Sequence, residues 1–375
     1  MPFSRTEHEN RLQQLRNESR RRGLDAILLD DCEALRYFTG YETSLSYYRA
    51  CVVPQGGHPF YVLRALDVAP LREQACIDDV IGHADWEDPI DVIAREAAAR
   101  GLGTARIGID LTSHALTVQV YERLKGRMPH ATFVDIDRLP WLLRRQKSPA
   151  EIEKLRAASR ICDSATQYVI DAARPGVTER ELANLAIAEM ARLGADPGLP
   201  GVVTTGRGWG MLHGHSHDKR LEAGDILHLE LLPRVDGYSA RMQRCALIGP
   251  VPDHLLRAFE TLRSAQDRQF EMLVPGAKAC DVDRILREAV LKSGLRDTYP
   301  NITGYTLGCY PDFFLRWSDF TWVFHPKADW IVEEGMAFHM YTSAAGLGLS
   351  ETVLVGPRGA ERLTRMERRL YSARG

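Results

Sequence analysis

Two stretches in the second half of the chain resemble each other: PGVTERELANLAIAEMARLG, from Pro175 to Gly194, and PGAKACDVDRILREAVLKSG, from Pro275 to Gly294. Each begins with Pro-Gly, places an acidic residue (Glu181 or Asp281) at the same offset and ends with glycine. Thr178 and Glu181 also match a capping box, which predicts a helix start. Each predicted helix precedes a strand-rich stretch, so we expect two similar α/β halves related by a pseudo-twofold axis. Chance similarity between two amphipathic helices is the alternative.

The chain before this repeat alternates helical and strand patterns. RLQQLRNESRRRG (11–23) predicts a helix that ends at its glycine, DAILLD (25–30) a buried strand, and ACVVPQGGHPFYVL (50–63) a hairpin. A long amphipathic helix is predicted to start at Ser148-Pro149. We therefore predict an α/β domain over residues 1–145 and a second domain over residues 146–375.

Composition limits the classes of function. The 375 residues are 45% hydrophobic and 26% charged with a net charge of −2, which is typical of a globular protein and argues against a nucleic-acid partner. The seven cysteines contain no CxxC pair, the N-terminus has no apolar segment typical of a signal peptide, and no apolar run approaches a membrane span. We expect a cytoplasmic protein with reduced thiols and no membrane association.

One motif, HGHSHD (213–218), suggests a metal site because it spaces three histidines ahead of an acid. The next segment, GDILHLELLPRVDGYSARMQRCALIG (224–249), predicts two antiparallel strands joined at RVDG. Leucines alternate with His228 and Glu230 in the first of these, which is the pattern of a strand.

These motifs occur in an order that resembles the pita-bread superfamily, which includes aminopeptidase P, prolidase, methionine aminopeptidase and creatinase. The similarity covers nearly the whole chain and implies an N-terminal creatinase-like α/β domain followed by a C-terminal pita-bread domain. The matching segments are YFTGY (37–41), RIGID (106–110), RRQKSPAEIEKLRAA (144–158), PGVTERELA (175–183), GDILHLE (224–230), GYTLG (304–308), EEGMAFHM (333–340) and SETVLVGPRGAERLT (350–364).

The resemblance also indicates what this chain lacks. Peptidases of the superfamily hold two metal ions with two Asp, one His and two Glu. The matching positions are, in chain order, Glu230, Arg241, Tyr305, Tyr341 and Ser350. An arginine at such a position is a permanent cation that cannot coordinate a metal. We therefore expect no dinuclear metal site and no other cofactor.

Creatinase is a member that hydrolyses a C–N bond without metal, and its catalytic histidine matches His213. The creatinase acids that recognise the guanidinium correspond to Gln243 and Tyr341. Its other site histidines correspond to Tyr305, Asp312 and Ser350. The resemblance thus implies similar chemistry on a substrate other than creatine.

Five residues are candidates for catalysis. His213 suits a general acid or base because imidazole titrates near neutral pH. Glu230 suits orientation or activation of substrate or water, and the hydroxyls of Tyr305 and Tyr341 suit a developing oxyanion. His339 precedes Tyr341 by two positions on a predicted strand, so both should share a face, which makes it a second candidate acid or base.

Other residues are candidates for substrate binding. Guanidinium groups suit a carboxylate, which favours Arg241 and Arg244. Arg49 is included because the N-terminal domain of one subunit often reaches its partner's active site in creatinase-like dimers, so we expect a homodimer. The full set is Arg241, Gln243, Arg244, Arg49, Asp312 and Glu351.

The leading hypothesis is a metal-independent hydrolase of a C–N bond in a small polar amidine, cyclic amidine such as ectoine, ureido or amide compound. Two alternatives stay open. One is an inactive binding protein, in which Glu230 and Arg241 are only a buried ion pair and the tyrosines only fill a cavity. The other is an Xaa-Pro-type metallopeptidase with a displaced metal site at His213, His215, His217 and Asp218.

Overall fold

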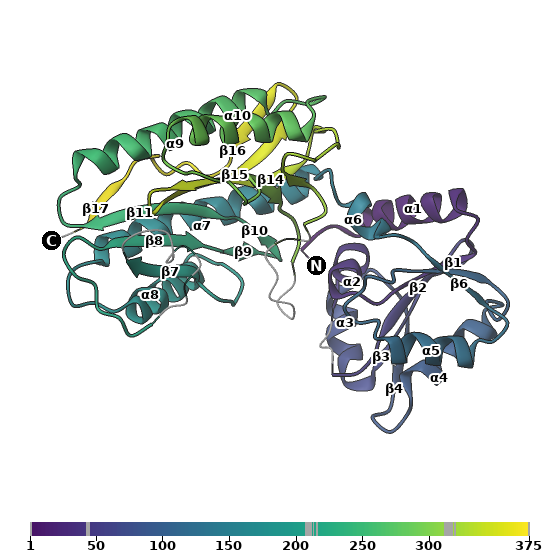
Figure 1. The fold of residues 1–375 in the computed structure, drawn as a ribbon. Coiled ribbons are helices and arrows are strands. Elements are labelled where there is room, and N and C mark those ends of the chain that lie inside the picture. Colours follow the sequence, from purple (N-terminus) through teal and green to yellow (C-terminus); the bar gives the residue numbers. More distant parts are fainter. Residues whose placement is uncertain are drawn as a thin grey trace. The chain divides into compact units, whose positions relative to one another are not determined.

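The chain folds into two compact units, of which the first ends at Arg144 and the second begins at Arg145. The computed structural model describes residues 2–42, 46–206, 212, 214, 217–310, 318 and 320–373. Figure 1 labels the helices and strands of both units. No helix in these ranges is long and apolar enough to cross a membrane.

The first unit is built on a six-stranded mixed sheet with the strand order β4-β3-β2-β1-β5-β6. β1 pairs with β2 in antiparallel and with β5 in parallel orientation, and the predicted hairpin is confirmed as β2 and β3. The strands are β1 (Ala26–Leu29), β2 (Ala50–Pro54), β3 (Phe60–Arg64), β4 (Asp79–His83), β5 (Arg106–Ile109) and β6 (Thr132–Asp135).

Helices cover both faces of this sheet, because successive residues of its buried strands point in opposite directions. Ile27 and Leu29 pack with α1, α2, α3 and α6, whereas Ala26 and Leu28 pack with α4 and α5. This layering confirms the predicted α/β fold class. The helices are α1 (Arg5–Arg21), α2 (Cys32–Thr39), the 3-10 turn η1 (Ala65–Asp67), α3 (Val68–Gln74), α4 (Pro89–Ala99), α5 (Val118–Arg127) and α6 (Leu139–Leu143).

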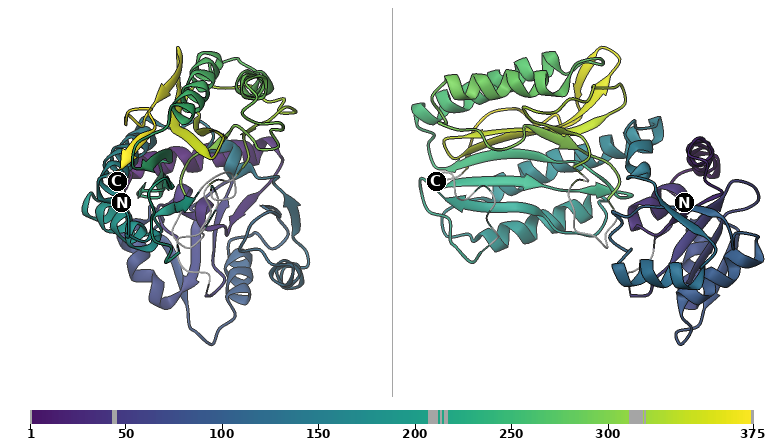
Figure 2. Two further views of the ribbon diagram at one scale, coloured as in Figure 1. Left: turned by 60° about the vertical axis from the view of Figure 1, so that its left-hand side comes forward. Right: turned by 45° about the vertical axis from the view of Figure 1, so that its right-hand side comes forward.

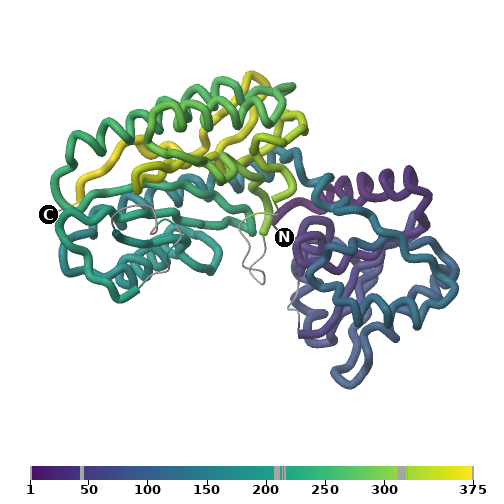
Figure 3. Tube along the Cα trace, in the orientation of Figure 1, coloured from purple at the N-terminus to yellow at the C-terminus, as the bar shows by residue number. Residues whose placement is uncertain are grey.

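The second unit contains two similar halves that follow one another along the chain, from teal to green and then from green to yellow (Figure 3). The first half contains α7 (Pro149–Ala172), α8 (Glu179–Arg192), β7 (Gly201–Gly206), β8 (Ile226–Leu231), β9 (Arg234–Val235), β10 (Tyr238–Ser239) and β11 (Met242–Ile248). The second half contains α9 (Asp253–Met272), α10 (Ala279–Lys292), β12 (Gly304–Thr306), β13 (Val323–Phe324), β14 (Ala337–Ala344), β15 (Leu347–Gly356), β16 (Gly359–Arg362) and β17 (Tyr371–Ala373).

The internal repeat is confirmed in detail. α8 and α10 both have 14 residues, and the residue just before each helix makes an isolated β-bridge, Thr178 with Arg220 and Lys278 with Ile331. The predicted helix starts are also confirmed, since Ser148 and Thr178 each form a complete capping box. α8 and α10 therefore correspond in length and in the bridge that precedes them, whereas α9 and α10 begin without a side-chain cap.

Two sheets meet inside this unit: a four-stranded sheet, β17-β11-β8-β7, and a five-stranded sheet, β13-β12-β14-β15-β16. The backbone N–H groups of Arg241 and Gln243 donate to the hydroxyls of Thr352 (2.8 Å) and Ser350 (2.7 Å), which ties β11 to β15. α7 and α8 pack on β7, β8 and β11, and α9 and α10 pack on β14 and β15. Figure 2 shows α9 and α10 side by side on one face.

Candidate active site

A cavity of about 600 Å³ lies in the second unit and collects most of the predicted catalytic side chains. Glu230 comes from β8, Arg241 directly precedes β11, and Gln243 lies at its start; Tyr305 comes from β12, and His339 and Tyr341 come from β14. The remaining lining residues are Leu199, Pro200, Gly201, Val202, Gly214, Leu232, Asn301, Ile302 and Phe320. The lining thus contains both apolar and polar residues.

Strand register explains why these side chains converge. Gln243 lies directly opposite Glu230 in the β8–β11 pair, and Tyr305 lies opposite His339 in the β12–β14 pair. His339 and Tyr341 are two residues apart on β14, so they share a face as expected. Both halves of the repeat therefore contribute residues to the cavity lining.

Two residues of the cavity lining, Glu230 and Arg241, form a buried ion pair. Arg241 donates to Glu230 Oε1 and to the hydroxyl of Tyr305, and Gln243 Nε2 donates to Glu230 Oε2. Burial by itself would raise the pKa of Glu230, but the adjacent positive charge of Arg241, the hydrogen bond from Gln243 and smaller contributions from neighbouring groups together lower the pKa to about 2. Glu230 is therefore an anion whose two oxygens both accept hydrogen bonds.

The aromatic side chains form a neutral cluster beside this pair. The ring centroids of Tyr305 and His339 are 5.0 Å apart, and the His339 and Tyr341 rings stack at 5.5 Å. Burial raises the pKa of both tyrosine hydroxyls, and burial together with the Arg241 charge lowers the pKa of His339 to about 3. At neutral pH the tyrosines thus keep their protons and the imidazole is uncharged.

The donor set of this cavity does not fit a divalent metal ion. Glu230, Arg241, Tyr305 and Tyr341 line the same space, so the positions that match the superfamily's ligands do come together. A guanidinium, however, is bonded to the carboxylate among them, and the two phenols keep their protons. Hard divalent ions need several anionic or carbonyl oxygens or imidazoles, which this set does not supply.

The predicted alternative, a displaced metal site at HGHSHD, falls partly outside the described residues, since His213 and His215 are not among them. Asp218 forms an exposed ion pair with Arg180 (2.6 Å), and the His217 backbone N–H donates to Glu179 (2.9 Å). Within the ranges that the structure describes, no three His, Cys, Asp or Glu side chains are grouped so that they could hold a metal ion.

Arg244 and Glu351, both predicted to bind substrate, lie outside the cavity lining and contact each other. Arg244 Nη2 donates to Glu351 Oε1 at 2.8 Å, and both side chains are fully buried. Arg244 Nη1 also donates to the backbone carbonyls of Gln243 and Ser350. These bonds favour a structural role for the pair.

Two further predicted substrate-binding residues are not among the cavity lining that the structure describes. Arg49 belongs to the first unit, where it is 1% exposed and its Nη2 lies 2.7 Å from the Cys32 Sγ. Asp312 lies outside the described residues, as does the predicted catalytic residue His213. The roles of all three stay predictions.

The sequence did not point to two features of the cavity wall. Ser350 Oγ lies 2.5 Å from His339 Nε2, although Ser350 was singled out only as a lost ligand position. Gly201 has a φ of +102°, and a Cβ there would lie 2.0 Å from the Glu230 carbonyl oxygen. A positive φ and such a close approach both require glycine. The single glycine in LPGVV carries no signal of this kind in the sequence.

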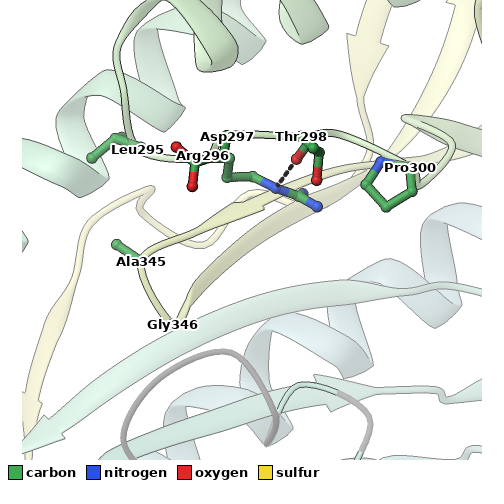
Figure 4. A pocket seen from close by; sticks show the side chains of 7 residues that line it. All are labelled: Leu295, Arg296, Asp297, Thr298, Pro300, Ala345 and Gly346. Carbon is green, nitrogen blue, oxygen red and sulfur yellow. Dashed lines mark hydrogen bonds between the residues drawn. The ribbon is translucent and has the colours of Figure 1, made fainter.

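A second, shallower hollow of about 420 Å³ lies between the loop Leu295–Pro300 and the turn Ala345–Gly346 (Figure 4). Arg296 crosses it, but its guanidinium already donates to the carbonyls of Thr298 and Ser343 and to Asn301 Oδ1. Because its donors are used within the protein, this hollow offers less to a ligand than the cavity of Glu230.

Comparison with known proteins identifies the class that this fold and site define. Residues 11–146 match the creatinase/prolidase N-terminal domain, and residues 153–357 match metallopeptidase family M24. The chain belongs to family M24 and has the pita-bread fold of the creatinase and prolidase group. The predicted resemblance is therefore confirmed.

Individual relatives differ in the reactions their names state. The chain is 25% identical to the ectoine hydrolase of Halomonas elongata, covering 99% of this chain and 98% of that one. It is 27% identical to an Xaa-Pro dipeptidase of Lactobacillus helveticus, covering 84% of each chain. The solved Xaa-Pro dipeptidase of Bacillus anthracis superposes with a TM-score of 0.82 at 22% identity, covering 97% of this chain and 99% of that one. Together these matches support a hydrolase of family M24.

Proposed function

We propose that this protein is a metal-independent hydrolase of a C–N bond in a small polar compound, such as an amidine, cyclic amidine, ureido or amide acid. The observation that carries the proposal is the Glu230–Arg241 ion pair in the space where the superfamily's peptidases hold their metals. The relationship to ectoine hydrolase over nearly the whole chain supports a substrate of this kind. A homodimer in the cytoplasm is part of the same proposal.

In the proposed reaction, His213 takes a proton from a water molecule while the water oxygen attacks the reacting carbon. The C–N bond then breaks and His213 returns its proton to the leaving nitrogen. Glu230 stays ionised throughout, since Arg241 and Gln243 hold its carboxylate.

The test combines turnover with metal analysis. Purified protein is assayed on ectoine, creatine, an N-carbamoyl amino acid and Ala-Pro, with wild type, His213→Ala and His217→Ala side by side. We expect turnover of a non-peptide compound that survives chelator, is lost in His213→Ala and is kept in His217→Ala. Stoichiometric zinc or manganese, with activity lost to chelator and in both variants, would instead establish the displaced metallopeptidase site.

The second candidate function, a binding protein without activity, is favoured by one observation. Arg241 and Gln243 already donate to the two carboxylate oxygens of Glu230, so these groups stabilise the cavity without any substrate. No turnover on any of the four compounds, together with a thermal shift produced by one of them, would support this function over hydrolysis.

A further inference from the structure

The two ring nitrogens of His339 have different surroundings. Nε2 lies 2.5 Å from the Ser350 Oγ, whereas Nδ1 is buried and has no hydrogen-bond partner among the described residues. The side chain lines the cavity and is only 1% exposed. Buried polar atoms are nearly always paired, so an unpaired ring nitrogen at a cavity wall indicates a partner that comes with a ligand.

The hydroxyl of Ser350 determines which nitrogen of His339 carries the proton. Its oxygen accepts the backbone N–H of Gln243 at 2.7 Å, so the serine's own proton needs an acceptor. Within the described part of the chain, His339 Nε2 is the acceptor in reach. A nitrogen that accepts is unprotonated, and the single proton of the neutral ring therefore lies on Nδ1.

Two more donors lie beside this N–H group. The Tyr305 hydroxyl accepts a hydrogen bond from Arg241, which leaves its own proton available, and the Tyr341 hydroxyl makes no hydrogen bond within the described ranges. The ring centroids of the three residues are 5.0 to 5.9 Å apart. Burial keeps both phenols protonated, so all three groups are neutral donors.

The nearby acceptor is already used, because the carboxylate of Glu230 accepts from Arg241 and Gln243. Gln243 Oε1, a buried acceptor without a partner in the described part of the chain, lies near Gly348 and His228, which do not line the cavity. Three free donors with no free acceptor beside them therefore complement a group that has several acceptor lone pairs and no donor of its own. A carboxylate meets this description, and hydrogen bonds to an ionised acceptor are the stronger kind. Arg241 adds a positive charge next to the cluster, although Glu230 balances it.

We propose that His339 Nδ1–H and the hydroxyls of Tyr305 and Tyr341 bind a carboxylate group of the substrate, and that Ser350 is a positioning residue that holds His339 in the donating tautomer. The inference deepens the proposed function, because the carboxylate is that of the hydrolysed compound. The test measures binding and does not depend on turnover. Absence of activity, which would contradict the proposed function, is therefore distinguishable from absence of carboxylate binding, which would contradict this inference.

The tautomer is measured by nitrogen-15 NMR on histidine-labelled protein at neutral pH, where couplings to the ring protons identify the protonated nitrogen. The His339 signals are assigned by their loss in His339→Gln. We expect the proton on Nδ1 in wild type and in Ser350→Thr, and a mixture that includes the Nε2–H form in Ser350→Ala. A proton on Nε2 in wild type would contradict the proposal regardless of how the variants fold.

Binding is tested with two probes of equal size, acetate and acetamide, followed through the His339 signals. We expect acetate to bind about tenfold more tightly than acetamide. Tyr341→Phe should weaken acetate binding about fivefold through loss of one hydrogen bond. The matched control is Tyr299→Phe, because the Tyr299 hydroxyl contacts Thr342 and does not line the cavity. Equal affinities for the two probes, or unchanged acetate binding in Tyr341→Phe, would overturn the inference.

Discussion

Arg241 donates a hydrogen bond to the carboxylate of Glu230, and both side chains are less than a tenth exposed. Removing one partner of a buried ion pair leaves a charge without compensation, which typically costs about 3–5 kcal/mol. We therefore predict that Arg241→Met lowers the free energy of unfolding by about 3 kcal/mol. The double variant with Glu230→Gln should recover most of this loss, as measured by urea denaturation.

An exposed pair provides the control for this double-mutant cycle. Arg180 and Asp218 also form an ion pair, but both side chains are more than half exposed. Arg180→Met should therefore cost less than about 1 kcal/mol. If the losses of the two single variants at Glu230 and Arg241 simply add in the double variant, the buried pair does not contribute as a unit.

His339 makes stability depend on pH. Burial and the Arg241 charge lower its pKa to about 3 in the folded chain, against 6.5 ordinarily. Between these values the unfolded chain binds a proton that the folded chain excludes, so the free energy of unfolding falls as the pH drops below 6.5. The slope contributed by one such group is at most about 1.4 kcal/mol per pH unit.

The measurement compares wild type with His339→Gln in urea at a series of pH values from neutral down to the onset of acid unfolding. The free energy of unfolding of the variant should depend less steeply on pH, and the difference in slope should correspond to at most one bound proton. Its stability at neutral pH should also change. His8, whose pKa burial lowers to about 4, titrates in both proteins and cancels in the difference. Parallel pH curves would contradict the burial of a neutral imidazole at this position.

Side chains alternate between the two faces of a β-strand, and this alternation is the reason that part of the site could be predicted from the sequence. The pattern of β8 places Glu230 on one face, and the spacing on β14 places His339 beside Tyr341, as the structure confirms. The same rule also separates Arg244 from Gln243 on β11. Arg244 was grouped with Arg241 because both carry a guanidinium, whereas strand alternation turns its side chain to the opposite face from Gln243.

The contact between Ser350 and His339 could not be predicted in this way. Tyr341 lies opposite Ser350 and Thr352 opposite His339, so the bond joins diagonal neighbours across β14 and β15. A shift of one residue in this register would turn every side chain of a strand to the other face. Sequence periodicity gives the face of each residue but not the register between two strands.

Gly348 provides a packing prediction. A Cβ at this position would lie 2.9 Å from His228 Cε1 and 3.0 Å from Gln243 Oε1. Gly348→Ala should therefore displace Gln243 from Glu230 and destabilise the protein by about 1–3 kcal/mol, the usual cost of overpacking. Gly126→Ala is the matched control, since nothing lies within 4 Å of its Cβ position on α5. A loss in the control equal to that in Gly348→Ala would count against this packing argument.

The last prediction separates a structural role of Arg244 from a role in binding. Its guanidinium donates to Glu351 and to the carbonyls of Gln243, Ser350, Met366 and Glu367, so all its nitrogens have partners. Lysine keeps the charge but lacks the planar fork that reaches several acceptors at once. We predict that Arg244→Lys lowers the free energy of unfolding by about 3 kcal/mol, because several buried acceptors lose their donors.

The control for this substitution is Arg156→Lys, since the pair of Arg156 with Glu361 is partly exposed. That change should cost less than about 1 kcal/mol. Acetate affinity also distinguishes the two roles. If Arg244 is structural, the donors of His339, Tyr305 and Tyr341 are unchanged in the molecules that remain folded, so acetate affinity should be unchanged. The structural role predicts a loss of stability. If Arg244→Lys instead keeps the stability of the wild type and weakens acetate binding, Arg244 binds the substrate.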